Sequence, residues 1–213
     1  MALSKKISES AVRRLSLYLR ILEHMECGGE STVSSEELAK HSDTTAAQVR
    51  KDLSLFGSFG KRGLGYNVGE LGLRIRKILG LDRRWKVALV GVGRIGSALV
   101  EYGGFQERGY DIAAILDVDP SKVGERWADL TVMDIAEFES IVEERDIEIV
   151  ILAVPVEAVP VVMDRVTGAG VLGILNFAPT TLRVPEGVTV KDVNMVMELE
   201  ALSFALSREE GEE

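Results

Sequence analysis

The stretch of sequence that decides the fold is Lys86-Val87-Ala88-Leu89-Val90-Gly91-Val92-Gly93-Arg94-Ile95-Gly96. Its apolar half predicts a buried strand, and its glycine half has the spacing GxGxxG at the start of a helical segment. In this context Gly91 permits a tight turn, Gly93 lets a pyrophosphate approach the backbone, and Gly96 lets helix and strand pack closely. The spacing alone is weak evidence, because glycine turns are common. Its place between a strand and a helix is where a dinucleotide-binding fingerprint requires it.

A carboxylate follows at the distance that such a fingerprint needs. A second predicted strand, residues 112–116, ends at Asp117, which lies 21 residues beyond Gly96. A carboxylate there accepts hydrogen bonds from the adenosine ribose and repels a 2′-phosphate, which favours NAD(H) over NADP(H). Alternatively, Asp117 caps a loop with Asp119 and Pro120. The residues expected to bind the cofactor here are Gly91, Val92, Gly93, Arg94, Ile95, Gly96 and Asp117.

The rest of the back two thirds alternates between strands and helices. Further strands are predicted at residues 147–154, 171–176 and 188–190, with helical connections between them. This alternation is typical of an α/β protein with a doubly wound parallel sheet, whose ligands bind beyond the carboxyl ends of the strands. Prolines at those ends also terminate strands for purely structural reasons. We expect an apolar nicotinamide pocket with one amide, formed by Val154, Pro155, Asn176, Phe177, Ala178 and Pro179.

Four helices are predicted ahead of a linker at residues 81–84, over residues 8–28, 35–39, 46–56 and 70–80. Capping boxes open the second helix at Ser34 and Glu37, and the third at Thr45 and Gln48. The first helix has an apolar stripe at helical spacing, which consists of Val12, Leu15, Leu19 and Leu22.

The third helix has an apolar face and a face of small, amide and cationic side chains. Such a polar face suits entry into a major groove, because Gln can bind adenine while Arg or Lys can bind guanine or phosphate. An ordinary amphipathic helix with a solvated face would have the same pattern. If the helix does bind DNA, the contacts expected on it are Gln48, Arg50, Lys51 and Ser54.

A glycine-rich segment, residues 57–66, follows this helix and predicts a bent hairpin. A hairpin after a helix-turn-helix is a wing, and an arginine at its tip can enter a narrow minor groove. The alternative is a solubilising turn. We expect Lys61, Arg62 and Tyr66 to contact DNA, and the front third to be a winged helix-turn-helix domain.

The charge is divided between the two parts of the chain. Residues 1–86 carry 16 Lys and Arg against 10 Asp and Glu, whereas residues 87–213 carry 9 against 24. A basic front and an acidic back indicate two units with different partners. A single Cys excludes a disulfide framework, and no apolar run approaches the roughly 18 residues that a membrane helix needs. We therefore expect a soluble cytoplasmic protein without a membrane partner.

The back two thirds lack the usual groups for proton transfer. Residues 87–213 contain neither His nor Cys, and no Tyr-x-x-x-Lys arrangement is present among Tyr102, Tyr110, Lys122 and Lys191. A dehydrogenase exchanges a proton as the hydride moves, most often through His. There is no metal-binding constellation either, so we expect a sensor and not an enzyme. The rival interpretations are an NAD-dependent oxidoreductase with an N-terminal partner-binding domain, and a module for another adenine ligand such as coenzyme A.

Taken together, these motifs resemble the Rex family of bacterial redox-sensing transcriptional repressors. The most specific matches are residues 45–54, 57–66, 91–96, 117–120 and 176–179. The resemblance implies a winged-helix domain over residues 1–80, a Rossmann-type NAD(H) domain over 85–192, and a C-terminal helix with an acidic tail over 193–213. That helix would be exchanged between the two subunits of a homodimer.

The resemblance also implies how the protein switches. Double-stranded operator DNA is bound in the presence of NAD+, and NADH releases the protein from it. A polar network between subunits would join Arg20, Tyr102 and a residue near Asn194, where the family often has Asp. An amide at that position loses a charge-assisted hydrogen bond to Arg20.

Overall fold

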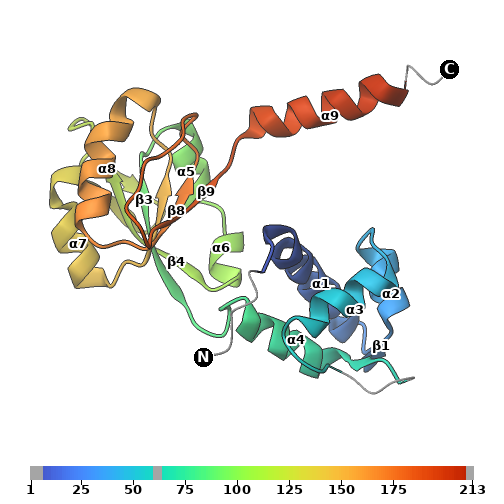
Figure 1. Ribbon diagram of the computed structural model, residues 1–213. Coiled ribbons are helices and arrows are strands. Elements are labelled where there is room, and N and C mark those ends of the chain that lie inside the picture. Colours follow the sequence, from blue (N-terminus) through green and yellow to red (C-terminus); the bar gives the residue numbers. More distant parts are fainter. Residues whose placement is uncertain (1–6, 60–63, 210–213) are drawn as a thin grey trace. The chain divides into compact units, whose positions relative to one another are not determined.

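The computed structural model describes residues 7–59 and 64–209 of the chain. It divides into two compact units, Met1–Arg83 and Arg84–Glu213, and the boundary falls in the predicted linker. Figure 1 labels most of the helices and strands of both units.

Unit 1 is a small helical domain with a two-stranded sheet. Its elements are α1 (Glu9–Cys27), β1 (Thr32–Val33), α2 (Ser35–His41), α3 (Ala46–Ser54), β2 (Tyr66–Asn67) and α4 (Val68–Ile78). The predicted capping box of α2 is confirmed, because Ser34 and Glu37 each accept a hydrogen bond from the other's backbone N–H. The last helix begins two residues earlier than predicted, since the Asn67 side chain caps it by accepting from the Glu70 N–H.

The core of unit 1 lies among its four helices α1, α2, α3 and α4. The apolar stripe predicted for α1 is buried at Leu15, Leu19 and Leu22 but not at Val12, which is 41% exposed. The buried arc of α1 is centred on Tyr18 and passes through Ala11 instead. The side chains buried in this core include Leu15, Tyr18, Leu19, Leu22, Leu38, Val49, Leu53, Leu71 and Ile75.

Two predictions for the segment around α3 need correction or fall outside the structure. The capping box at Thr45 is only half formed, because Thr45 Oγ1 accepts from the Gln48 N–H but the Gln48 side chain turns elsewhere. Strand β2 pairs antiparallel with β1, so the end of the glycine-rich segment joins the sheet. Lys61 and Arg62, at the expected tip of the wing, lie outside the described residues.

Unit 2 contains a seven-stranded sheet with the order β5-β6-β4-β3-β7-β8-β9. All pairs are parallel except the edge pair β5–β6. This confirms the doubly wound sheet, with a switch in strand order at the central strand β3. The short strands β5 and β6 were not predicted. The strands are β3 (Trp85–Val90), β4 (Tyr110–Asp117), β5 (Arg126–Trp127), β6 (Leu130–Asp134), β7 (Ile149–Leu152), β8 (Gly173–Asn176) and β9 (Thr189–Asp192).

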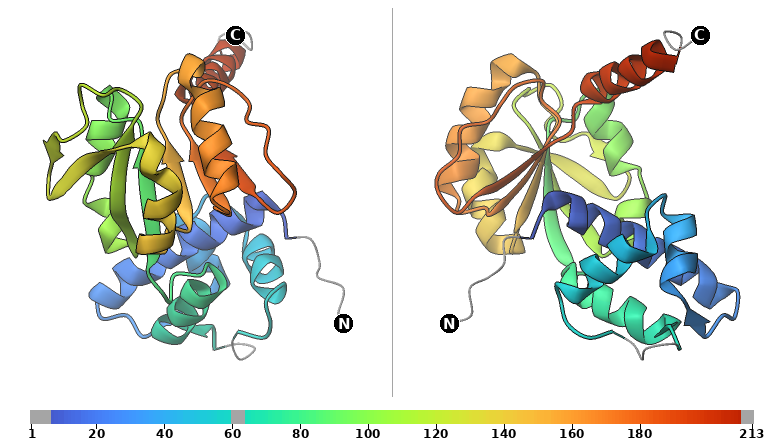
Figure 2. Two further views of the ribbon diagram at one scale, coloured as in Figure 1. Left: turned by 90° about the vertical axis from the view of Figure 1, so that its left-hand side faces the viewer. Right: turned by 45° about the vertical axis from the view of Figure 1, so that its right-hand side comes forward.

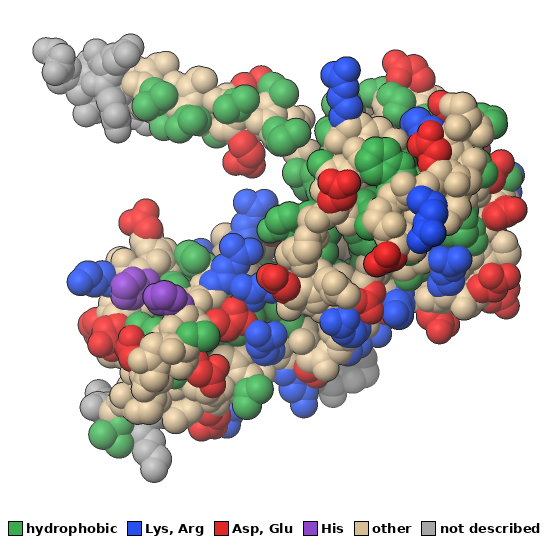
Figure 3. Space-filling view, turned by 180° about the vertical axis from the view of Figure 1, so that it is seen from behind, with side chains coloured by type: hydrophobic (Ala, Val, Ile, Leu, Met, Phe, Trp, Pro, Cys, Tyr) green, Lys and Arg blue, Asp and Glu red, His purple; other side chains and the backbone are tan. Residues whose placement is uncertain are grey.

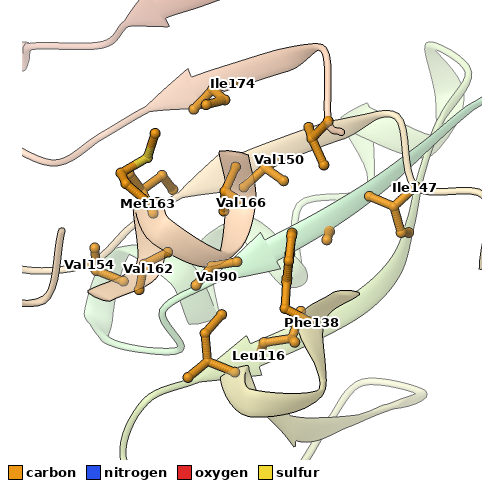
Figure 4. Close-up of a cluster of buried hydrophobic side chains, with 14 of the residues drawn as sticks. Val90, Leu116, Phe138, Ile147, Val150, Val154, Val162, Met163, Val166 and Ile174 are labelled. Atoms are coloured by element: carbon orange, nitrogen blue, oxygen red, sulfur yellow. The ribbon is translucent and has the colours of Figure 1, made fainter. Parts of the chain in front are cut away.

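The two faces of this sheet are covered unequally (Figure 2). Helices α7 (Phe138–Arg145) and α8 (Val159–Gly168) cover one face, and Figure 4 shows how Phe138 and Val162 meet Val90 and Leu116 there. The other face packs against α5 (Arg94–Val100) and α6 (Gly104–Glu107). The prediction of a helical connection is wrong between β8 and β9, which residues 177–188 join without a helix. This connection packs on the face of α7 and α8, where Leu182 is buried, so the face with α5 and α6 is the less covered one.

An apolar groove of about 330 Å³ lies on this less covered face. Its lining comes mainly from β7, β8 and β9, and includes Phe105, Tyr110, Ile149, Ile151, Leu175 and Thr189. The last helix, α9 (Met195–Glu209), is apolar on more than one side and displays these side chains (Figure 3). Between 55% and 65% of each is exposed for Met195, Val196, Met197, Leu199, Leu202, Phe204 and Leu206.

Candidate dinucleotide site and nucleic-acid interface

The glycine turn after β3 has the geometry that a dinucleotide fingerprint requires. Gly91 has a φ of +100°, and a Cβ on it would come within 2.5 Å of the Ala153 carbonyl oxygen. A Cβ on Gly96 would collide with the carbonyl oxygen of Gly91. By contrast, a Cβ on Gly93 would meet no atom within 4 Å. The outer two glycines are therefore needed by the fold, whereas Gly93 keeps an open space beside the turn.

Asp117 at the end of β4 holds this turn in place through a hydrogen bond to its backbone. Its side chain is 4% exposed, and its Oδ2 accepts a 2.8 Å hydrogen bond from the Val92 N–H. The other oxygen accepts from the Asp119 N–H at 3.0 Å. The loop-capping alternative is therefore correct as a structural description, and it coexists with a position beside the glycine turn.

Lys122 is a residue of this site that sequence reasoning considered only as a proton donor. Its ammonium group donates to Asp117 Oδ2 at 2.9 Å. The spacing Asp-x-Asp-Pro-x-Lys, with the loop turning back after Pro120, could have indicated this pair. Because a cation lies next to Asp117, the carboxylate repels a 2′-phosphate less strongly than the sequence alone suggests.

The ends of β7 and β8 lie next to the glycine turn, as predicted from the strand order. The Ala153 N–H donates to the Val90 carbonyl, and the Phe177 N–H donates to the Leu152 carbonyl, both at 2.8 Å. These bonds bring the two loops after the strands to the same edge of the sheet as Gly91. Of the expected pocket residues, Val154 and Ala178 are buried, Phe177 is half-buried, and Pro155 and Pro179 are exposed.

The amide of Asn176 is used within the protein. Its Nδ2 donates to Asp192 Oδ1 at 2.7 Å and to the Thr180 carbonyl at 2.9 Å, while its Oδ1 accepts from the Ala178 N–H. Asn176 is 1% exposed. It therefore shapes the loop that carries Phe177 and Ala178, and the geometry gives it no free group to direct at a nicotinamide. Arg94 and Ile95 follow Gly93 in the sequence and are exposed.

On the polar face of α3, the expected DNA contacts differ in how free they are. Lys51 and Ser54 are exposed, and the Ser54 hydroxyl donates to the Lys51 carbonyl of the same helix. Arg50 donates to Glu36 Oε1 of α2 at 3.1 Å, in an ion pair whose side chains are both more than half exposed. Tyr66 shares a 3.4 Å hydrogen bond with the Ser35 hydroxyl and is half-buried. An anion that binds Arg50 therefore competes with Glu36.

Gln48 is held by a buried carboxylate that sequence reasoning missed. Asp52 is 1% exposed and accepts hydrogen bonds from Gln48, from Tyr18 and, twice, from Arg14. Burial opposes ionisation of Asp52, but the hydrogen bonds from Arg14, Gln48 and Tyr18 hold its pKa below the usual value. The signal in the sequence was a charged residue between Val49 and Leu53, on the side of α3 that faces the core.

The three residues of the expected switch network have separate surroundings. Arg20 is an exposed residue of α1. Tyr102 is 60% exposed and packs edge to face on Phe105, with ring centroids 5.2 Å apart. Asn194 caps α9, because its Oδ1 accepts from the N–H groups of residues 196 and 197. This capping role gives the Asn194 side chain partners within its own helix.

Over residues 7–59 and 64–209, no group of three or more His, Cys, Asp or Glu side chains is placed to hold a metal ion. Within the same ranges, no helix is long and apolar enough to cross a membrane.

Comparison with known proteins identifies relatives over nearly the whole chain. Residues 6–54 match a family described as "Putative DNA-binding protein N-terminus", and residues 82–180 match the family of CoA binding domains. The chain is 47% identical to the redox-sensing transcriptional repressor Rex of Carboxydothermus hydrogenoformans, over 96% of this chain and 98% of the relative. It is 45% identical to the Rex protein of Streptomyces coelicolor, over 99% of this chain and 81% of the relative.

Solved structures of a Rex-family repressor, RSP, resemble this chain equally completely. The complex of RSP with β-NAD+ and operator DNA superposes with a TM-score of 0.91 at 36% identity, covering 96% of this chain and 94% of RSP. The complex with β-NADH gives a TM-score of 0.86 at 34% identity, covering 97% of each chain.

Proposed function

Because the chain belongs to the Rex family of redox-sensing transcriptional repressors, we propose that each of its two units performs one half of the switch. Unit 1 binds operator DNA through α3 and the segment 57–66, and unit 2 binds NAD+ or NADH at the glycine turn. One observation supports this most strongly: the chain resembles, from end to end, a repressor solved with β-NAD+ and operator DNA together. The protein is a regulator, and the oxidoreductase alternative is not favoured.

In the cofactor site, we assign the pyrophosphate to the open space beside Gly93. A Cβ there would point into that space, whereas Gly91 and Gly96 are already closed in by protein atoms. Asp117 and Lys122 lie at the end of the adjacent strand, where the adenosine ribose is expected. Asp117 accepts from the ribose hydroxyls, and Lys122 holds the carboxylate in place.

Redox discrimination follows from the charge of the nicotinamide ring. NAD+ carries a positive ring and NADH a neutral one, and the expected pocket at Val154, Phe177 and Ala178 offers apolar side chains. Burial in such a pocket favours the neutral ring, because an unpaired buried charge is costly. NADH therefore draws its ring into a closed site, while NAD+ leaves that site open.

We further propose that α9 binds a second copy of this chain. The groove lies on the face of the sheet that packs against α5 and α6, and its lining is almost wholly apolar. The exposed side chains of α9 supply the complementary surface, and α9, at 15 residues, is roughly 22 Å long. If two chains exchanged α9, each helix would cover the groove on the partner's sheet, and the two chains would form a homodimer.

A dimer also explains how cofactor binding is transmitted to DNA. Two recognition helices must match half-sites about 34–36 Å apart, so a change of several ångströms in their separation prevents simultaneous binding. To move the dimer from 1% to 99% in the form released from DNA, NADH must bind that form more tightly than the DNA-bound form by about 5.5 kcal/mol in total. Two cofactors per dimer can share this difference. Because the target is operator DNA, we place the protein in the cytoplasm.

The test is a gel-shift titration on a pseudo-palindromic operator at varying ratios of NADH to NAD+. We expect NADH to release the DNA and NAD+ to leave it bound. Lys51→Ala should lower operator affinity without changing NADH affinity, and Asp117→Ala should lower NADH affinity without changing DNA affinity in the absence of cofactor. Retention of the operator at saturating NADH would refute the proposed function.

A further inference from the structure

The Asp52 cluster, formed by Arg14, Tyr18, Gln48 and Asp52, plays no part in the switch described above. It joins α1 to the middle of α3. Asp52 is the one buried carboxylate among the described residues of unit 1. A buried charge is costly unless donors satisfy it, so the presence of Asp52 in the core indicates a specific role.

The carboxylate of Asp52 is fully satisfied. Arg14 binds both oxygens, with Nε at 2.6 Å from Oδ2 and Nη2 at 2.8 Å from Oδ1. Tyr18 donates to Oδ2 at 3.0 Å, and Gln48 Nε2 donates to Oδ1 at 2.7 Å. Four donors match the roughly four lone-pair sites of an ionised carboxylate. The arrangement therefore leaves Asp52 no spare capacity for DNA or for water.

This bond determines which way the Gln48 amide faces. An ionised carboxylate only accepts, so Gln48 must direct Nε2 and not Oε1 toward Asp52. No described residue donates to Gln48 Oε1, and Gln48 is half-exposed. It is the third residue of α3, and the N-terminal residues of a recognition helix are those that contact base edges.

We propose that Asp52 is a positioning residue for sequence recognition, which fixes the Gln48 amide with Oε1 toward the major groove so that it accepts a hydrogen bond from a base amino group. The inference rests on the proposed function, since it requires α3 to enter the groove. Adenine suits the fixed amide best, because N6 donates to Oε1 while N7 accepts the second Nε2–H.

The selectivity arises from what the fixed amide rejects. A freely rotating amide can flip and offer Nε2 to the acceptor oxygens of thymine or guanine. With Asp52 in place the flip costs the 2.7 Å bond and sets Oε1 against a carboxylate oxygen. A base that presents an acceptor to Gln48 is therefore disfavoured.

The experiment compares base preferences of full-length variants. Wild type, Gln48→Ala, Asp52→Asn and the double variant are each bound to randomised duplex DNA, and the bound fractions are sequenced. We expect wild type to disfavour acceptor-presenting bases about tenfold at one position in each half-site. In both single variants the base preference at that position should fall to within about twofold, and the preferences at the other positions should be unchanged. The double variant should be no flatter than Gln48→Ala, because Asp52 acts through Gln48.

A purely structural role for Asp52 gives a different result. Loss of packing alone would weaken binding to all sequences alike and lower the melting temperature, without singling out the Gln48 position. Glu23→Gln is the matched control, since it neutralises a carboxylate of unit 1 that pairs with Arg76 and is not an expected DNA contact. An Asp52→Asn profile that matches wild type, or that is flattened evenly, overturns the inference.

A second measurement does not depend on the folding of the Asp52 variant. In DNA-free, 15N-labelled wild-type protein, the Gln48 side-chain proton that is bonded to Asp52 should exchange with solvent more slowly than the other proton of the same amide, and Gln48→Ala identifies both signals by their loss. If both protons exchange at the rate of a free glutamine side chain, the inference is overturned even if the operator is bound normally and NADH releases it. A failure of wild type to bind any operator would instead count against the proposed function, because the amide signals are recorded without DNA.

Discussion

Alanine substitutions at Gly93 and Gly96 test whether the glycine turn serves the cofactor or the fold. The two positions lie three residues apart and receive the same methyl group. At Gly93 the methyl enters open space, and the backbone has an ordinary φ of −92°. At Gly96 it collides with the Gly91 carbonyl oxygen and comes within 3.2 Å of Leu89. Gly93→Ala should therefore impair cofactor binding, and Gly96→Ala should impair stability.

The magnitudes follow from these surroundings. Replacing glycine with alanine at Gly93 costs a few tenths of a kcal/mol or more as a weaker N-cap, and gains about 0.4–1 kcal/mol by restricting the unfolded chain, so stability should hardly change. At Gly96 the helix propensity of alanine contributes up to about 1 kcal/mol. Against it stands a clash with backbone, which exceeds the usual overpacking cost of about 1–3 kcal/mol. A net loss of about 2 kcal/mol would lower Tm by about 4–8 °C for a chain of this size.

Thermal melting without cofactor and fluorescence titration with NADH together separate the two effects. We expect Gly93→Ala to melt within about 2 °C of wild type and to bind NADH at least about tenfold more weakly, a loss of about 1.4 kcal/mol or more. Gly96→Ala should melt several degrees lower. Wild-type NADH affinity in Gly93→Ala would show that the pyrophosphate lies elsewhere, and wild-type melting in Gly96→Ala would refute the packing argument.

Three further predictions concern the DNA face, the subunit interface and the alkaline limit of stability. Glu36→Gln should raise operator affinity by up to about fivefold, because it frees Arg50 from an exposed pair worth at most about 1 kcal/mol; an unchanged gel shift would contradict this. Leu202→Asp should convert the dimer to a monomer in analytical ultracentrifugation, whereas Ser203→Asp on the same helix should have a smaller effect; a dimeric Leu202 variant would exclude α9 from the interface. Burial and the hydrogen bond to Asp52 raise the pKa of Tyr18 from 10.0 to about 12, so the unfolded chain loses this proton first and stability should fall as the pH rises from about 10 to about 12. In urea titrations Tyr18→Phe should lose less stability than wild type over that pH range, and equal losses would rule out this linkage.

Much of the fold was predictable because its signals are local. The strand before Gly91, the helix caps at Ser8 and Ser34, and the linker near Arg83 all depend on residues a few positions apart. The edge strand β5 was missed because it has only two residues, and β6 was missed because Thr131 and Asp134 interrupt its apolar pattern. The missing helix between β8 and β9 was also not foreseen, since the sequence predicts strands more clearly than the connections between them.

The candidate site was predictable in its backbone and less so in its side chains. The glycine turn and the ends of β7 and β8 follow from strand order, which a parallel sheet fixes. The hydrogen-bond partners of Gln48, Arg50 and Asn176 cannot be predicted from strand order, because each partner comes from another segment or from the next helical turn. Polar side chains that a sequence presents as free for ligands are often already hydrogen-bonded within the fold.

The two proposed binding elements of this protein are each held in place by a buried carboxylate. Asp52 and Asp117 are the two buried carboxylates among the described residues, 1% and 4% exposed. Each is bound by one cation, Arg14 or Lys122, and each uses an oxygen to hold a binding element, the Gln48 amide or the Val92 N–H. A buried charge is costly unless donors satisfy it, so each carboxylate holds its donors in one orientation. Each carboxylate thereby fixes the orientation of a proposed binding element, so replacing either should change what the protein binds.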